Sequence, residues 1–307
     1  MKLTDAGLET VLIFDEGIEL PEFAAFPLVD GDDGRAALRR YYTSFVELAR
    51  DRGVPLVLST PTWRANPDWG RLLGYEGDDL AAVNRRAVEI VESARDEVLG
   101  GSDGDRAEVV VDGCVGPRSD AYRPTAIMDA REAERYHAPQ LRTLAEAGCT
   151  QVTALTLSYV DEAVGIARAA AAAGIPVHIG FTVETEGRLP SGTSIEEAVL
   201  AVDHATDGVV ESFLINCAHP THFADSLPDG DARLRIRGVR ANASMLSHVE
   251  LDEAEELDSG DPLDLAERYV SLRSELPALE LLGGCCGTDI RHVGAICDAW
   301  LAADAAA

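Results

Sequence analysis

Apolar and polar positions alternate along the chain with two different periods. Eight short apolar runs, several rich in β-branched residues, are typical of strands, and segments with a 3.6-residue apolar repeat lie between them. The predicted strands are residues 2–5, 55–60, 107–114, 151–157, 176–183, 208–217, 233–241 and 279–283.

The segments between the strands are predicted helices, and some carry end signals. Gly53 suits a helix C-cap, while Ser194 in S-I-E-E and Asp161 in D-E-A suit N-caps. Strand and helix alternate about eight times, which favours a single closed (β/α)₈ TIM-type barrel over an open sheet. Because no Gly/Ser/Pro-rich linker interrupts the pattern, we expect one domain over residues 1–307. The predicted helices are 34–53, 78–99, 131–147, 161–173, 194–205, 261–275 and 289–303.

The barrel interpretation locates the candidate chemistry. Active sites of such barrels lie at the carboxyl ends of the strands, so polar or reactive residues that end an apolar run are the candidates. These are Asp5, Thr60, Cys114, Thr156, Glu184, Asn216, Cys217, Asn242, Cys285 and Cys286.

Three cysteines among these candidates have a spacing that suits a metal. Cys217 follows the sixth strand, and Cys285 and Cys286 follow the eighth in L-L-G-G-C-C-G-T. Adjacent cysteines bridge each other poorly, but strands six and eight are near neighbours on a barrel rim, where three thiols can meet. A Cys₃ set binds Zn²⁺ and leaves a fourth position open. Such a zinc ion suits activation of an incoming thiol, which indicates alkyl transfer to sulfur.

Charge limits the choice of partners and solvent. The chain has 54 acidic and 26 basic residues, a net charge of −28, and Lys2 is its only lysine. This charge repels nucleic acids and anionic membranes, so neither is expected as a partner. The carboxylates are spread along the chain, and high salt would screen their repulsion, which indicates a halophilic protein. The sequence shows no membrane-spanning run and no signal-peptide core, so we expect a cytoplasmic location; a homo-oligomer stays open.

Several motifs together resemble one enzyme family. The N-C after strand six and the G-G-C-C-G-T after strand eight resemble the zinc motifs of the homocysteine S-methyltransferase family. T-D-A-G-L-E-T (4–10) is similar to its opening D-G-G motif, S-T-P-T-W-R-A-N (59–66) to its T-x-T-F segment, and 180–198 to its strand-five block. The likeness extends over essentially the whole chain.

The resemblance implies a reaction and a set of site residues. A small activated donor, such as an S-methylmethionine-like sulfonium, would give its methyl group to the thiol of homocysteine, producing methionine and placing the protein in methionine biosynthesis. The implied residues are Cys217, Cys285 and Cys286 for Zn²⁺, and Asp5, Gly7, Thr60 and Asn216 for the substrate.

Two positions depart from the family pattern. Ala6 replaces a glycine of D-G-G, and Leu155 stands where the family has a glutamate that holds the substrate ammonium. Either Glu184 or another carboxylate substitutes, or the acceptor is a different thiol. A non-catalytic zinc- or thiol-binding barrel and a thiol-redox protein therefore remain alternatives.

Other residues have both a chemical and a packing interpretation. His219 and His222, in C-A-H-P-T-H, could bind metal or line a loop, and Asp112 could bind substrate or cap a turn. Trp63 and Tyr159 could face a cationic donor or simply pack. Cys114 and Cys297 are expected to be structural, and Cys149, beside a helix-ending glycine, gives no chemical signal.

Overall fold

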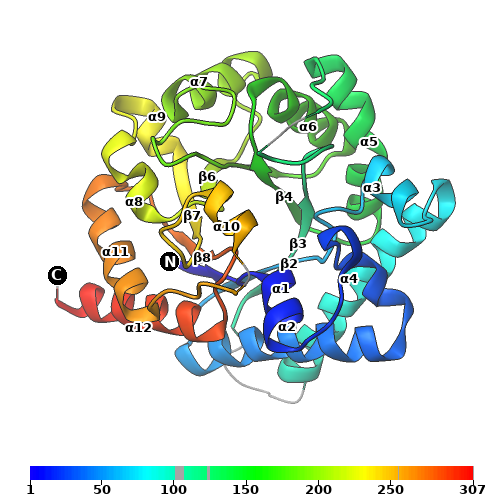
Figure 1. The fold of residues 1–307 in the computed structure, drawn as a ribbon, viewed down its shortest axis with the longest axis horizontal. Coiled ribbons are helices and arrows are strands. Elements are labelled where there is room, and N and C mark those ends of the chain that lie inside the picture. The colour runs from blue at the N-terminus through cyan, green and yellow to red at the C-terminus, as the bar shows by residue number, and fades with distance from the viewer. Residues whose placement is uncertain (101–106, 123–124, 255, 307) are drawn as a thin grey trace.

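The computed structural model, which describes residues 1–100, 107–122, 125–254 and 256–306, is a closed barrel of eight parallel strands surrounded by helices (Figure 1). Strand order follows the chain, and the last strand pairs with the first. The predicted (β/α)₈ TIM-type fold is therefore confirmed. The strands are β1 (Lys2–Thr4), β2 (Leu56–Ser59), β3 (Val109–Val115), β4 (Gln151–Leu157), β5 (Val177–Phe181), β6 (Ser212–Asn216), β7 (Ile236–Ala241) and β8 (Leu281–Gly284).

Each of the seven predicted helices is present. Gly53 ends the first long helix in the left-handed conformation, with φ of +64°, and Ser194 forms a capping box with Glu197. Asp161 is not a cap, because the helix already begins at Val160 and Asp161 lies in its first turn. The helices are α1 (Leu8–Thr10), α2 (Asp32–Arg52), α3 (Pro67–Leu72), α4 (Gly77–Leu99), α5 (Ala130–Glu146), α6 (Val160–Ala173), α7 (Ile195–Thr206), α8 (Pro220–Phe223), α9 (Gly230–Arg235), α10 (His248–Glu253), α11 (Pro262–Glu275) and α12 (Ile290–Ala306).

The apolar residues form two layers. Val57, Leu214 and Leu281, from the even-numbered strands β2, β6 and β8, form a small buried cluster of their own. Layers built from alternate strands are typical of the inside of a TIM barrel. A much larger cluster joins strand residues to the apolar faces of the helices, for example Phe45 of α2 and Val91 of α4. Strands buried on both faces explain the continuous apolar runs in the sequence.

Two predicted strands begin several residues too early: the sixth starts at Ser212 rather than at residue 208, and the seventh at Ile236 rather than at residue 233. Residues 233–235 belong to α9 rather than to the seventh strand. The alternation in R-L-R-I-R imitates a strand, but Gly230, with φ of +58°, begins a helical turn. Arg235 at the end of that turn pairs with Asp203 of α7 at 2.7 Å, which fixes it outside the sheet.

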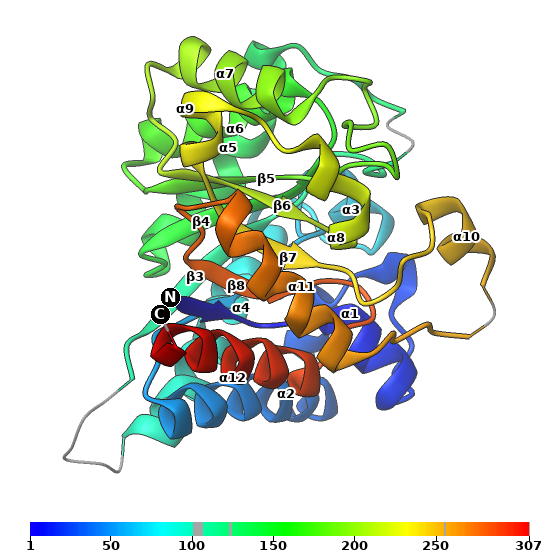
Figure 2. The ribbon, with the colours of Figure 1, turned by 90° about the vertical axis from the view of Figure 1, so that its left-hand side faces the viewer.

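The carboxyl ends of the strands lie under a set of short helices. Figure 2 shows α1 and α10 on the side toward which β1 and β7 run, away from the two chain termini. The loops that this side carries are the ones that sequence analysis selected for the site. Among the described residues, the structure has no helix with the length and apolar character needed to cross a bilayer.

Candidate functional site

The structure brings Cys217, Cys285 and Cys286 together at the carboxyl ends of β6 and β8. Their sulfur atoms all lie within 4.8 Å of one another, and the sulfurs of Cys217 and Cys286 are 3.6 Å apart. All six cysteines of the chain are free thiols. Among the described residues, these three form the group of side chains that could hold a metal ion.

The loop after β8 is held in place by its neighbours. The amide of Cys285 donates to the carbonyl of Ala241 at 2.8 Å, and the carbonyl of Cys286 accepts from Ala243 at 3.0 Å. Gly287 then turns the chain with φ of +77°, a conformation that favours glycine. On the other side, a Cβ at Gly7 would lie 2.4 Å from the carbonyl oxygen of Cys285, so only glycine lets the β1 loop approach this closely.

Cys217 is held in a strained conformation. Its φ is +55°, which costs a non-glycine residue about 1–3 kcal/mol. Its carbonyl accepts hydrogen bonds from His248 Nε2 at 2.7 Å, from the Tyr122 hydroxyl at 3.3 Å and from Thr182 Oγ1 at 3.3 Å. The rings of Tyr122 and His248 are stacked with centroids 3.6 Å apart. These contacts offset the strain and fix the direction of the sulfur.

The three thiols share their protons unequally. Hydrogen bonds from the Cys217 and Cys286 thiols lower the pKa of Cys285 well below its ordinary value. Contacts with Cys217 and Cys285 raise the pKa of Cys286, and the contact with Cys285 raises that of Cys217. A cation bound among the three sulfurs would compete with their protons. Three soft sulfur donors at this spacing fit Zn²⁺.

A pocket, which we call the first pocket, opens beside the thiols. It combines the loop after β1 with the ends of β2 and β4, and Cys114 forms part of its wall. Trp63 also lines it and donates its ring N–H to the carbonyl of Leu155 at 3.3 Å. The lining residues are Asp5, Ala6, Gly7, Leu8, Glu9, Thr10, Phe23, Ser59, Thr60, Trp63, Cys114, Leu155, Thr156, Cys217, Arg240, Cys285 and Cys286.

Two charged side chains of the first pocket neutralise each other. Arg240 Nη2 lies 3.0 Å from Asp5 Oδ1, and both side chains are buried. The Tyr41 hydroxyl donates to the other Asp5 oxygen at 3.3 Å, and Arg240 also donates to Ser59 Oγ at 2.8 Å. Burial raises the pKa of Asp5, and the guanidinium of Arg240 acts against that rise.

Glu9, in α1, is the third charged side chain in this pocket. Burial raises the pKa of its carboxyl to about 7, and the negative groups of Cys285 and Asp5 act in the same direction. Neither Glu9 nor Arg240 was selected from the sequence. Two features of the sequence could have indicated them. Glu9 comes soon after the first strand. Arg237 and Arg240 are an odd number of positions apart in one strand, so their side chains point to opposite faces of the sheet, and Arg237 is the one on the outside.

The end of β4 is irregular where it borders the pocket. The pairing of β4 with β5 shifts register between Ala154 and Leu157, and Thr156 within this bulge has φ of +64°. Asn216 holds the bulge: its side-chain oxygen accepts from the Thr156 amide and its nitrogen donates to Thr156 Oγ1, both at 2.9 Å. Asn216 is fully buried and does not line the first pocket, so it supports the wall from behind.

The remaining candidates lie outside the first pocket. Glu184 pairs with His248 Nδ1 at 3.3 Å, and Asp112 accepts from Gln151, Thr153 and Ser59 inside the barrel. His219 caps α8, and His222 Nε2 lies 2.9 Å from the carbonyl of Met245. Tyr159 accepts from the amide of Met128. Cys149 and Cys297 are buried in the core.

A second pocket adjoins the first at the thiols. Both pockets include Thr10, Phe23, Cys217 and Cys286 in their walls. The second pocket reaches out under α10 and carries aromatic rings and carboxylates. Its other lining residues are Phe14, Tyr122, Asn242, Ser244, His248, Leu251, Asp252, Ala254, Glu256, Leu257, Asp258 and Gly287.

Comparison with known sequences decides the family. Residues 3–300 match the family described as Homocysteine S-methyltransferase. The chain belongs to the homocysteine S-methyltransferase family. As a member of it, the protein is a methyltransferase, and the resemblance seen in the cysteine motifs is confirmed. A comparison with curated proteins gave no match.

Solved structures support the fold of this family member. The metallated form of the homocysteine methyltransferase MmuM from Escherichia coli is 19% identical, with a TM-score of 0.77 over 97% of this chain and 96% of that chain. Its oxidized form is 19% identical, with a TM-score of 0.78 over 96% of this chain and 94% of that chain. At this identity the likeness shows that the two proteins share the barrel along almost their whole length.

Proposed function

We propose that this methyltransferase uses Zn²⁺ to transfer a methyl group from a small cationic donor to the thiol of homocysteine, giving methionine. The observation that carries the proposal is the meeting of two pockets at Cys217 and Cys286. Two reactants that enter from different pockets would face each other beside the thiols, which is what a direct displacement between them requires.

The first pocket suits the thiol acceptor. The acceptor sulfur would lie at the three cysteines, and the rest of the molecule would lie along the loop after β1, beside Gly7 and Thr60. Since a glycine is required at position 7, the backbone of this loop approaches both the site and the β8 loop closely. Trp63 and Leu155 supply apolar walls that exclude water from the reacting sulfur.

The second pocket suits a cationic methyl donor. Phe14, Phe23 and Tyr122 place aromatic rings in its wall, and aromatic faces attract sulfonium and quaternary ammonium groups. Asp252 and Glu256 add negative charge on the same wall. The combination favours an S-methylmethionine-like sulfonium over an anionic or neutral donor.

Cys217, Cys285 and Cys286 would hold the zinc ion. When bound, Zn²⁺ keeps a thiol deprotonated and nucleophilic at neutral pH. The protein supplies the orientation: His248, Tyr122 and Thr182 fix the Cys217 carbonyl, and the β7 loop fixes the pair on β8. Contacts of this kind with ligand residues raise metal affinity about 10–100-fold.

The test measures methionine by mass spectrometry after incubating zinc-loaded protein with homocysteine and S-methylmethionine in molar salt. Cys286→Ser should lose bound zinc and product together. Cys297→Ser, which changes a buried cysteine of α12 away from the site, is the matched control and should keep both.

Two results would contradict the proposal. Methionine formation that survives removal of zinc would indicate thiol chemistry without a metal. Absence of product from protein that holds one zinc per chain, with sulfonium and ammonium donors alike, would indicate a binding protein rather than this reaction.

A further inference from the structure

The first pocket contains one carboxylate without an ion pair to another side chain, although the guanidinium of Arg64 is near enough to act against the rise in its pKa. Asp5 and Arg240 form a buried pair at 3.0 Å, so neither offers a free charge to a ligand. For Glu9, in contrast, the described part of the chain supplies no ion pair and no hydrogen bond from another side chain. Of the charged side chains that line the pocket, Glu9 is therefore the carboxylate without a partner at ion-pair distance in the described part of the chain.

No other carboxylate competes for this role. Leu155 lines the same pocket and contributes an apolar surface at the end of β4. Glu184 lines neither pocket, and its carboxylate is engaged by His248 at 3.3 Å. Among the charged side chains in the wall, Glu9 is thus the one available to a cationic ligand.

Glu9 is also fixed close to the thiols. Thr10, the next residue, donates to the carbonyl of Gly7 at 2.9 Å and accepts from the amide of Gly287 at 3.1 Å. Gly7 lies against the carbonyl of Cys285. The short helix α1 therefore packs directly on the loop that carries two of the three sulfurs, and its carboxylate lies within electrostatic reach of Cys285.

We propose that Glu9 is the positioning residue that binds the ammonium group of the acceptor, so that the substrate class is a short aminothiol. This inference rests on the proposed function. An aminothiol with its sulfur at the cysteines has its ammonium only a few bonds away, on the side where α1 lies. A half-buried carboxylate in a pocket is stabilised by a ligand that neutralises it, which favours an aminothiol over a thiol without an amine.

The test compares two ligands that differ only in the amine. Binding of homocysteine and of 4-mercaptobutanoate to zinc-loaded protein is measured by calorimetry, with zinc content determined for every variant. Glu9→Gln should weaken homocysteine binding about tenfold or more, because a hydrogen bond between charged groups is lost. Binding of 4-mercaptobutanoate should change less than about twofold, because it has no ammonium to lose.

Two further variants sharpen the comparison. Glu19→Gln makes the same charge change at an exposed residue of neither pocket and should leave both affinities unchanged. Leu155→Glu, added to Glu9→Gln, should restore part of the homocysteine affinity by placing a carboxylate on the facing wall. Equal binding of homocysteine to wild-type protein and Glu9→Gln would overturn the inference, and so would equal loss of both ligands.

Methionine formation is measured separately and distinguishes the two proposals. Amine-selective binding that depends on Glu9, without turnover, would support the role of Glu9 and contradict the proposed function. Methionine formation with an unchanged KM for homocysteine in Glu9→Gln would support the proposed function and overturn the role of Glu9.

Discussion

Individual residues at the site depart from favoured backbone geometry. Thr156, in the bulge at the end of β4, and Cys217, directly after β6, have φ of +64° and +55° and both line the first pocket. Such conformations persist only where surrounding contacts determine them. Asn216 supplies two hydrogen bonds for Thr156, and three donors converge on the Cys217 carbonyl. The strain is therefore concentrated where side-chain direction matters for chemistry.

Asp112 gives a prediction for pH. Burial raises the pKa of its carboxyl from 3.8 to about 6, despite hydrogen bonds from Gln151 and Thr153. Between these values the folded protein keeps a proton that the unfolded chain releases, so the free energy of unfolding falls as pH rises from about 4 to 6. Asp112→Asn removes this cost, and relative to wild type it should gain about 3 kcal/mol between about pH 4 and 7.

The measurement is urea unfolding of both proteins over that pH range. The asparagine oxygen can still accept from Gln151 and Thr153, so the variant should fold at every pH tested. A difference in stability that does not change with pH would show that Asp112 ionises normally in the folded protein.

The sequence predicted the thiol cluster and part of the wall of the first pocket, including Asp5, Gly7 and Thr60, but not the whole wall. Cys217, Cys285 and Cys286 are identifiable because each ends a strand, and the barrel topology then brings the ends together. Glu9 and Arg240 are not, because their roles depend on which neighbours neutralise them. Asp5 follows β1 and Arg240 lies in β7, so the two meet only because the barrel closes. The apolar period within one segment cannot predict such a pair.

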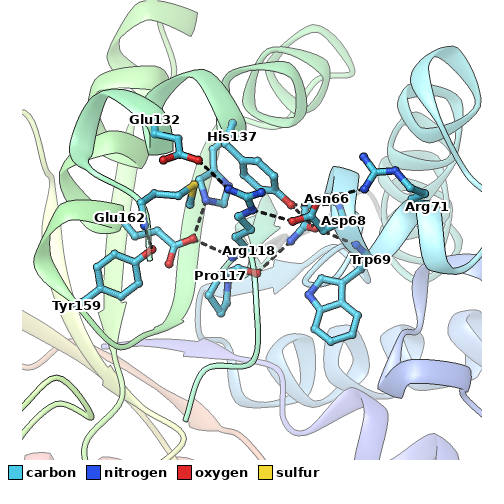
Figure 3. A network of polar contacts seen from close by, with 12 residues as sticks. Asn66, Asp68, Trp69, Arg71, Pro117, Arg118, Glu132, His137, Tyr159 and Glu162 are labelled. Carbon is cyan, nitrogen blue, oxygen red and sulfur yellow. Dashed lines mark hydrogen bonds and ion pairs between the residues drawn. The ribbon is translucent and has the colours of Figure 1, made fainter. Parts of the chain in front are cut away.

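At the scale of elements, a polar network joins the loops on one side of the barrel. Figure 3 shows Arg118, in the loop after β3, between Asp68 of α3 on one side and Glu132 and Glu162 on the other. Its guanidinium pairs with Asp68 at 2.7 Å and with Glu132 at 2.9 Å, and its amide donates to Glu162 at 2.8 Å. Glu162 of α6 also pairs with His137 of α5 at 2.9 Å. The network thereby fixes Arg118 against α3, α5 and α6.

Burial predicts which contact of this network matters for stability. The side chains of Glu162 and His137 are 1% and 0% exposed, whereas that of Glu132 is 47% exposed. Glu162→Ala leaves buried partners unsatisfied and should lower the free energy of unfolding by about 3 kcal/mol. Glu132→Ala removes an exposed ion pair and should cost less than about 1 kcal/mol.

Both variants are compared with wild type by urea unfolding at neutral pH. If the two variants lost similar free energies of unfolding, or if Glu132→Ala lost more, the buried contacts of Glu162 would not be the ones that stabilise the protein.

Element boundaries were predictable where end signals are local. Gly53 and Ser194 mark helix ends through backbone conformation and a capping side chain, and both were read correctly. The short helices α1 and α10 were not predicted, because three or six residues are too few to show a helical period. They cover the site, so the three thiols could be located from the sequence better than the elements that cover them.

For the whole molecule, charge is the dominant feature. A net charge of −28 on one barrel produces repulsion that opposes the folded state, and salt reduces it. The melting temperature should therefore rise by several degrees when KCl is increased from about 0.1 to 1 M, because the screening length falls from about 10 to 3 Å.

Thermal unfolding followed by circular dichroism tests this, with sucrose as a non-ionic control. A melting temperature that stays constant or falls with KCl would contradict a halophilic adaptation. An equal rise in sucrose alone would show that solute exclusion, rather than charge screening, stabilises the protein.

Barrel closure also determines when the site can exist during synthesis. Two of the three thiols follow β8, which pairs with β7 on one side and with β1 on the other. A nascent chain that has not yet docked β8 leaves Cys217 without its partners, however completely the first seven strands have formed. A cation that needs all three thiols could therefore bind only after β8 has docked between β7 and β1.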